Sequence, residues 1–243
     1  MQILSSVSRL GGLVAAWVFP AGCAACGANM VRGAAMCGRC RESLTPLPPA
    51  CPRCAQPTGA QSIRCRRCRI HPLPLDAIVT PWLYGGELAT AVRRLKFSRE
   101  VAGARELAPL WAGALAATVQ AYGAELIVPI PLHWRRRWQR GFDQNTLLVH
   151  HAVHYAAIPA PIVHCLRRIR HTKEQSLLAA RERQSNLNRA FVVPLAQRAG
   201  VVGKRVVLVD DVVTTGATMA AAARALHRAG VAAVIGVALA RAE

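Results

Sequence analysis

The chain has 243 residues and a mass of 26.1 kDa, which is room for one medium-sized domain with a small addition and too little for three ordinary domains. Lysine and arginine outnumber aspartate and glutamate by 31 to 12, a formal net charge of +19, while 53% of the residues are hydrophobic. This apolar content excludes a disordered basic tail as the main character of the protein. The charge indicates anionic partners: phosphates, nucleic acid or an anionic surface.

The chain contains an apolar stretch near its start that resembles part of a targeting signal. Residues 10–22 follow Arg9 and run into Cys23, but the stretch is shorter than the roughly 18 residues of a membrane span and contains Pro20. The total of nine cysteines is odd, and most of them have metal spacing, which is unusual for an exported, oxidised protein. We therefore expect an amphipathic helix over residues 2–19, no membrane span and a cytoplasmic location.

The cysteines form four Cys-x-x-Cys knuckles, each starting 14 residues after the one before. Two such knuckles complete a tetrahedral cage of four thiolates around zinc, with no position left open for chemistry. We predict two structural Zn²⁺ sites, with disulfides or redox motifs as the weaker alternative. Sequential pairing is favoured because it closes two short hairpins, and interleaved pairing is the alternative. The predicted ligands are Cys23, Cys26, Cys37, Cys40, Cys51, Cys54, Cys65 and Cys68.

Proline-rich stretches divide the chain. Prolines at 46–49 separate the two predicted zinc hairpins, and the stretch at 71–75 marks the exit from the zinc region. We predict a helix plus double zinc ribbon over residues 1–75 and a second domain over residues 76–243. The remaining cysteine, Cys165, is expected to be a small buried hydrophobe on a strand.

The second domain alternates apolar strands with amphipathic helices, which predicts an α/β fold with a mostly parallel sheet covered on both faces. Ligands of such sheets bind at the carboxyl ends of the strands. The expected strands are 77–84, 125–130, 161–165, 205–210 and 231–239, and the expected helices are 87–97, 104–121, 143–157 and 217–229, with a polar helix-and-loop stretch up to about 189.

The segment VVLVDDVVTTGAT, residues 206–218, combines a buried strand, an acidic pair and a glycine turn that opens a helix. Such a turn aims backbone N–H groups at one point beside a helix N-terminus, which suits a phosphate. The adjacent carboxylates can bind the vicinal hydroxyls of a ribose. The alternative is an acidic pair that holds magnesium, followed by an ordinary helix cap. The residues concerned are Asp210, Asp211, Thr214, Thr215, Gly216, Ala217 and Thr218.

This segment resembles the phosphoribosyl-pyrophosphate (PRPP) signature of type I phosphoribosyltransferases. Together with the cysteine knuckles, GELATAVRRLKF, RRRWQRGFDQN and RRIRHTKEQSLLAARERQSNLNRAF, it makes nearly the whole chain resemble the ComF family. These are competence-associated, phosphoribosyltransferase-like proteins with an N-terminal double zinc ribbon. The resemblance implies a Rossmann-like type I phosphoribosyltransferase fold that binds PRPP together with Mg²⁺, and an association with DNA uptake.

The resemblance also assigns roles to residues. It places Asp210 and Asp211 on the ribose hydroxyls and residues 214–218 on the 5′-phosphate. It makes residues 166–190 a mobile hood over the site. The usual RGFNQ of the family reads RGFDQ here, so the carboxylate of Asp143 replaces an amide and offers no N–H donor. The loop that would contact the pyrophosphate consists of Pro131, Leu132 and His133.

Basic residues concentrate beside the predicted site, because residues 127–209 carry fourteen lysines and arginines against three acidic residues. Arginine forks and magnesium commonly neutralise a pyrophosphate leaving group. In the hood we expect anion contacts from Arg170, Lys173, Gln175 and Arg181, with an exposed helix as the alternative. A second cluster resembles a surface for single-stranded DNA, with a solvated loop as the alternative, and consists of Trp134, Arg135, Arg136, Arg137, Trp138 and Arg140.

Two functions follow from these features. The first is transfer of a phosphoribosyl group from PRPP to an unknown acceptor. The second is a non-catalytic adapter that binds single-stranded DNA, uses PRPP as a regulatory ligand and works with other DNA-uptake proteins. A PRPP-responsive regulator would share the site, but no helix-turn-helix pattern supports it. No residue in the sequence stands out as a general base.

Overall fold

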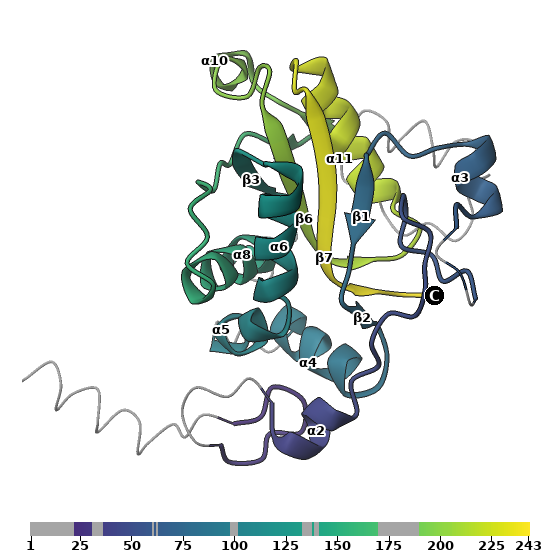
Figure 1. Cartoon of the computed structure of the whole chain (residues 1–243). Coiled ribbons are helices and arrows are strands. Elements are labelled where there is room, and N and C mark those ends of the chain that lie inside the picture. The colour runs from purple at the N-terminus through teal and green to yellow at the C-terminus, as the bar shows by residue number, and fades with distance from the viewer. Residues whose placement is uncertain are drawn as a thin grey trace, which may run out of the picture.

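A parallel sheet forms the centre of the computed structural model, which describes residues 22–30, 36–59, 61, 63–97, 102–132, 138, 141–169 and 190–243. The strand order is β1-β7-β6-β3, and β2 pairs further along β7 (Figure 1). The predicted mostly parallel sheet is therefore confirmed. Its strands are β1 (Ala77–Val79), β2 (Trp82–Leu83), β3 (Leu126–Pro129), β6 (Arg205–Val213) and β7 (Ala233–Arg241), beside a separate antiparallel pair of β4 (Arg167–Arg168) and β5 (Phe191–Val192).

Helices cover both faces of the sheet. Alternate residues of β6 enter different cores: Val207 and Val209 pack under α4, α5, α6 and α8, whereas Val206 and Leu208 pack under α11. Burial on both sides explains why these strands read as continuous apolar runs. The helices are α4 (Gly86–Phe97), α5 (Ala102–Leu107), α6 (Ala112–Tyr122), α8 (Gln144–Tyr155), α10 (Leu195–Arg198) and α11 (Ala217–Arg228).

Prolines account for two differences from the predicted elements. The strand expected at 77–84 is interrupted between β1 and β2, where Pro81 has no N–H to donate to the sheet. The helix expected at 104–121 is divided into α5, a 3₁₀ turn over Ala108–Leu110 and α6, because Pro109 lies inside that turn.

Two strand predictions also change at their ends. β6 continues past the expected end at residue 210 to Val213, because β7 runs beside it and Val213 pairs with Arg241. The strand expected at 161–165 is reduced to one parallel bridge between Ile127 and Ile162. Cys165 is fully buried, as expected, but lies outside any strand.

The two zinc ribbons repeat the same backbone design 28 residues apart. The N–H of Cys23 donates to the carbonyl of Ala28 at 2.8 Å, and the N–H of Cys51 donates to the carbonyl of Gln56 at 2.8 Å. In each ribbon the third cysteine caps a short helix, α2 (Gly38–Glu42) in the first and α3 (Arg66–Ile70) in the second. They lie apart, with α2 beside α4 and α3 on the side of α11 (Figure 1).

Each ribbon shares a core with one face of the sheet. The first ribbon contributes Met36 and Leu44 to the core that contains α4 and α8, and the second precedes Leu73 and Leu75, which belong to the core under α11. The ribbons are therefore packed into the same two cores as the second domain.

Two predicted segments, the helix at 2–19 and residues 170–189 of the hood, lie outside the described residues. Within the described ranges, none of the helices has both the length and the apolar character that crossing a membrane requires.

Candidate functional site

The candidate ligand site lies at the carboxyl edge of the sheet, where β3 and β6 run side by side with Pro129 opposite Val209. Asp210 and Asp211 are the next two residues of β6. The strand ends at Val213, and a turn then leads into the amino end of α11. Pro131 and Leu132 follow β3, and both are half-buried. The topology therefore brings the predicted acidic pair, the glycine turn and the start of the predicted pyrophosphate loop to one edge.

The acidic pair is held by side chains from two helices. The Nδ2 of Asn145 donates to Oδ1 of Asp210 at 2.8 Å, and the Nζ of Lys96 lies 2.7 Å from Oδ2 of Asp211. The Nε2 of Gln144 donates to the same Oδ2 of Asp211 at 3.2 Å. Lys96 comes from the last turn of α4, while Gln144 and Asn145 open α8. The carboxylates are thus fixed in place before any ligand binds.

The two aspartates differ in their surroundings. Removal from water and the neighbouring charge of Asp211 raise the pKa of Asp210 to about 7, although Asn145 and Lys96 act in the opposite direction. Asp211 is 6% exposed and forms the direct ion pair with Lys96. Asp210 therefore changes charge near neutral pH, while Asp211 carries the ion pair.

The first two residues of the glycine turn are exposed, whereas Gly216 is buried. Thr214 and Thr215 are exposed, and Gly216 caps α11 with φ +75°, a left-handed conformation that favours glycine. A Cβ at Gly216 would lie 3.0 Å from Cδ1 of Leu73, so the position is tight as well. The amino end of this 12-residue helix follows directly, with Ala217 and Thr218 half-buried, and the N–H of Ala217 donates to Oγ1 of Thr215 at 3.3 Å. This arrangement suits an anion.

The carbonyl side of the turn is held by two arginines. The Nη1 of Arg241 donates to the carbonyl of Thr214, and the Nη2 of Arg67 donates to the carbonyl of Thr215. The Nη2 of Arg241 also donates to Oε1 of Gln56, a residue of the second zinc ribbon. Side chains from β7 and from the second zinc ribbon therefore hold the turn by its carbonyl groups.

Asp143 connects the predicted pyrophosphate loop to α8. Its Oδ2 accepts a hydrogen bond from the N–H of Leu132 at 3.0 Å, and its Oδ1 accepts from the N–H groups of Asn145 at 3.1 Å and Thr146 at 3.3 Å. The residue that departs from the usual family pattern thus acts only as an acceptor in these contacts. It caps the helix and restrains the loop at once.

Several predicted contacts lie outside the described residues, so the structure does not place them. Among the described residues of the arginine-rich segment, Trp138 is 86% exposed. The undescribed ones are His133 of the loop, Trp134, Arg135, Arg136, Arg137 and Arg140 of the DNA cluster, and Arg170, Lys173, Gln175 and Arg181 of the hood.

The sequence analysis missed the residues that hold the acidic pair and the turn. Lys96 has one available signal, because it is one of only three lysines in the chain. Gln144 and Asn145 follow Asp143 at a recognisable helix start. Arg67 and Arg241 have no such signal, because their partners lie 148 and 27 residues away in the chain.

The cysteines fit two zinc sites with sequential pairing. The first group is Cys23, Cys26, Cys37 and Cys40, and the second is Cys51, Cys54, Cys65 and Cys68, with all sulfurs of a group within 4.8 Å of one another. The Sγ atoms of Cys26 and Cys37 lie 3.8 Å apart, and those of Cys54 and Cys65 lie 3.6 Å apart. These are the edges of a tetrahedron with zinc–sulfur distances near 2.3 Å. All the cysteines are free of disulfide bonds.

Comparisons with known proteins agree with this architecture. A family model described as a double zinc ribbon domain matches residues 14–69, and one described as a phosphoribosyl transferase domain matches residues 163–243. The DNA utilization protein YhgH of Salmonella typhi is 37% identical over 202 residues, which cover 82% of this chain and 87% of that protein. Competence protein F of Haemophilus influenzae is 30% identical over 199 residues, 81% of this chain and 86% of that protein.

A more distant relative is similar over a comparable share of the chain. Competence protein ComFC of Bacillus subtilis is 25% identical over 210 residues, which cover 82% of this chain and 81% of that protein. Similarity over most of both chains, together with the two matched domains, shows that this protein is a member of the ComF family, with a double zinc ribbon and a phosphoribosyltransferase domain.

Proposed function

We propose that this protein binds PRPP at the carboxyl edge of its sheet and serves the uptake or use of DNA. The observation that carries the proposal is the joint placement of Asp210, Asp211 and the turn at 214–218 on β6 and α11. Relatives named for competence and for DNA utilization support the biological setting. Two groups of four cysteines arranged to bind zinc fit a reducing compartment, so we place the protein in the cytoplasm.

In this proposal each part of PRPP has its own contacts. The ribose hydroxyls donate hydrogen bonds to the carboxylates of Asp210 and Asp211. The 5′-phosphate accepts from the N–H groups and hydroxyls of residues 214–218 at the positive end of α11. The pyrophosphate lies toward Pro131 and Leu132. Carboxylates are ligands that Mg²⁺ accepts, so the acidic pair fits magnesium brought in with PRPP, which would neutralise charge on the pyrophosphate.

The activity that we propose is transfer of the phosphoribosyl group to an acceptor that is still to be identified. The bond between the anomeric carbon and the pyrophosphate oxygen breaks, pyrophosphate leaves with the bonding electron pair, and the acceptor forms the new bond to the anomeric carbon. The chain contributes by holding the ribose at two points, which fixes the anomeric carbon relative to the loop after β3.

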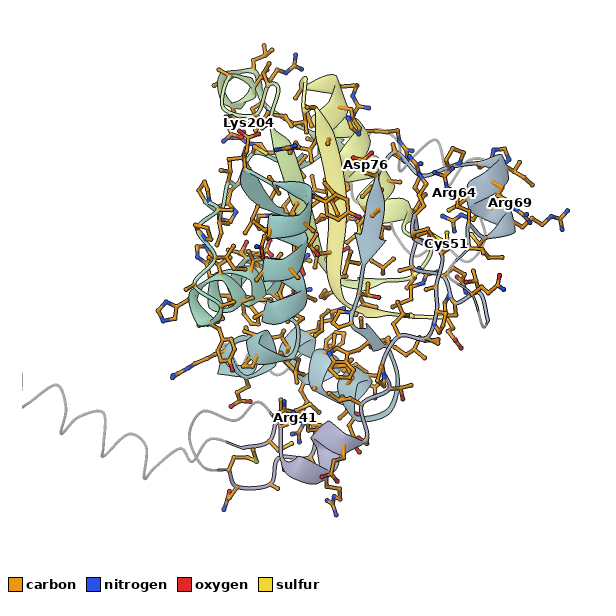
Figure 2. The ribbon with its side chains drawn as sticks, in the orientation of Figure 1. Arg41, Cys51, Arg64, Arg69, Asp76 and Lys204 are labelled. Atoms are coloured by element: carbon orange, nitrogen blue, oxygen red, sulfur yellow. The ribbon has the colours of Figure 1, made fainter. Side chains whose placement is uncertain are left out.

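Isothermal titration tests the site. Wild-type protein should take up PRPP in the presence of Mg²⁺, and the Asp210→Asn/Asp211→Asn variant should bind at least tenfold more weakly, because neutral amides lose the charge-assisted bonds to the hydroxyls. Glu125→Gln is the matched control, since Glu125 pairs with Lys204 at the opposite end of β6, and Lys204 is labelled in Figure 2. Equal binding by wild type and the double variant would refute the assignment.

The adapter function is favoured by one observation, the 86% exposed side chain of Trp138 in an arginine-rich segment. Exposed aromatic rings stack bases of single strands, and arginines neutralise their phosphates. The logarithm of the association constant for a single-stranded oligonucleotide should fall linearly with the logarithm of the salt concentration. Trp138→Ala should lower that association constant several-fold. Binding that depends on PRPP, without release of pyrophosphate, would favour the adapter over the transferase.

A further inference from the structure

The turn proposed to hold the 5′-phosphate is also held through its backbone carbonyls, which accept hydrogen bonds from two arginines. Arg241 is 3% exposed, and it has hydrogen bonds to the carbonyl of Thr214 and to Gln56. Arg67 reaches the next carbonyl, that of Thr215. A trans peptide holds its C=O and the following N–H in opposite directions. Fixing these two carbonyls toward the arginines therefore turns the N–H groups of Thr215 and Gly216 to the other side of the turn.

The second zinc site determines where these anchors stand. Arg67 lies between Cys65 and Cys68, two members of the second cysteine group. Gln56, the partner of Arg241, lies two residues after Cys54, and its carbonyl accepts a hydrogen bond from the N–H of Cys51 at 2.8 Å. Zinc on these sulfurs would therefore fix the chain at both anchor points.

Charge supports the same coupling. Among the described residues, neither Arg67 nor Arg241 forms an ion pair with a carboxylate of the kind that joins Lys96 to Asp211 or Lys204 to Glu125. A zinc ion on four thiolates carries a net charge of about −2. With zinc bound, the second site would therefore supply negative charge beside two arginines that approach the turn from its carbonyl side.

The first ribbon provides an internal comparison. The repeat of 28 residues aligns Arg39 with Arg67 and Cys37 with Cys65. Arg39 and Arg67 are both exposed, but the ribbon of Arg39 belongs to the core on the other face of the sheet. In Figure 1 α2 lies well away from α11, whereas α3 lies on the same side as that helix. The repeat thus presents an equivalent arginine that has no access to the turn.

We infer that Arg67 and Arg241 are positioning residues of the phosphate turn, and that the second zinc ribbon, through Arg67 and Gln56, holds this turn in its ligand-binding conformation. The inference rests on the proposed function for its ligand, PRPP, but the anchoring of the turn does not depend on that ligand. The first ribbon has no part in it. Arg67 and Arg241 act through the backbone and need not touch the ligand.

The test compares Arg67→Gln with Arg39→Gln in the full zinc-loaded chain. Ribose 5-phosphate and pyrophosphate with Mg²⁺ serve as separate probes in isothermal titration. Arg67→Gln should bind ribose 5-phosphate about tenfold more weakly, as expected for the loss of one charge-assisted hydrogen bond, and should bind pyrophosphate as wild type does. Arg39→Gln should change neither. A general loss of folding would weaken both probes, so the selective loss identifies positioning.

A second measurement needs no ligand. Backbone ¹⁵N relaxation in the unliganded protein should show lower order parameters for the amides of Thr215 and Gly216 in Arg67→Gln, and wild-type values in Arg39→Gln. Cys65→Ser should act like Arg67→Gln, while Cys37→Ser, its equivalent in the first ribbon, should leave the turn unchanged. If Arg67→Gln and Arg39→Gln match in order parameters, the inference is overturned.

The two proposals fail in different ways. Wild-type protein that binds neither PRPP nor ribose 5-phosphate would refute the proposed function, and the order parameters would still decide whether the second ribbon positions the turn. Wild-type protein that binds both, with Arg67→Gln binding equally well, would overturn the inference and leave the proposed function intact.

Discussion

Replacing Lys96 with methionine should destabilise the protein, mainly at alkaline pH. The Nζ of Lys96 lies 2.7 Å from Oδ2 of Asp211, and the two side chains are 21% and 8% exposed. At this separation and an effective dielectric constant near 20, the attraction amounts to about 6 kcal/mol. Loss of hydration offsets much of it, so we expect the free energy of unfolding to fall by about 2 kcal/mol at pH 8.

The cost should shrink at lower pH because Asp210 becomes neutral. The pKa of Asp210 is raised to about 7 by burial and by the charge of Asp211. At pH 8 both carboxylates of the wild type are charged, and removal of Lys96, which lowers the pKa of Asp210, leaves the pair either to repel each other or to take up a proton; both outcomes destabilise the fold. At pH 5 Asp210 is mostly protonated, so the same substitution leaves one charge fewer and should cost about half as much.

Urea denaturation followed by tryptophan fluorescence, at pH 5 and pH 8, measures this difference. Asp211→Asn in the Lys96→Met background should recover most of the lost stability, because Asp210 then has no neighbouring negative charge and still accepts the hydrogen bond from Asn145. Lys204→Met is the matched control: its ion pair with Glu125 has the same 2.7 Å distance but is 45% and 41% exposed, so its loss should lower the free energy of unfolding much less than the loss of Lys96 does. An equal loss at both pH values, without recovery by Asp211→Asn, would refute the reasoning.

Three further substitutions follow from the geometry. The raised pKa of Asp210 stabilises the fold at acidic pH and loses that effect as pH rises through about 7, so Asp210→Asn should raise the melting temperature relative to wild type at pH 8 more than at pH 4. Asp143→Asn should lower the free energy of unfolding in urea by about 1 kcal/mol, because an amide NH₂ cannot accept the hydrogen bond from Leu132; an unchanged value would contradict this. Gly236→Ala should cost about 1–3 kcal/mol in the same assay, since its Cβ would lie 2.8 Å from Sδ of the buried Met219, and no loss would mean that α11 shifts freely.

The features that could be predicted from the sequence are those whose parts lie close together in the chain. Each predicted set of zinc ligands spans one ribbon, and the sequential pairing is the one in which all four sulfurs come together. The acidic pair and the glycine turn belong to one continuous segment, so their order along β6 and α11 follows from local pattern. Strand and helix types were predictable for the same reason.

What could not be predicted depends on how distant elements pack. Lys96 reaches Asp211 only because α4 lies with its last turn at the carboxyl edge of the sheet. Asn145 reaches Asp210 because α8 starts beside β6. The spacing of hydrophobic residues indicates which face of a helix is buried, but it does not determine where along a strand that helix ends. Partners of the acidic pair therefore remain hidden until the sheet register is known.

The pairing of β1 with β7 has a consequence for biosynthesis. Residues 77–79 cannot form their strand pairing until residues 235–237 have been synthesised. The ribosome makes the cysteines of both ribbons, residues 23–68, long before β7 emerges, so zinc capture can precede completion of the sheet. If zinc is lacking during translation, the second ribbon is not folded when Arg241 is synthesised. Arg241 then has no ordered Gln56 to bind. Metal supply during translation, and not only the metal content of the finished protein, would then decide how much of it matures.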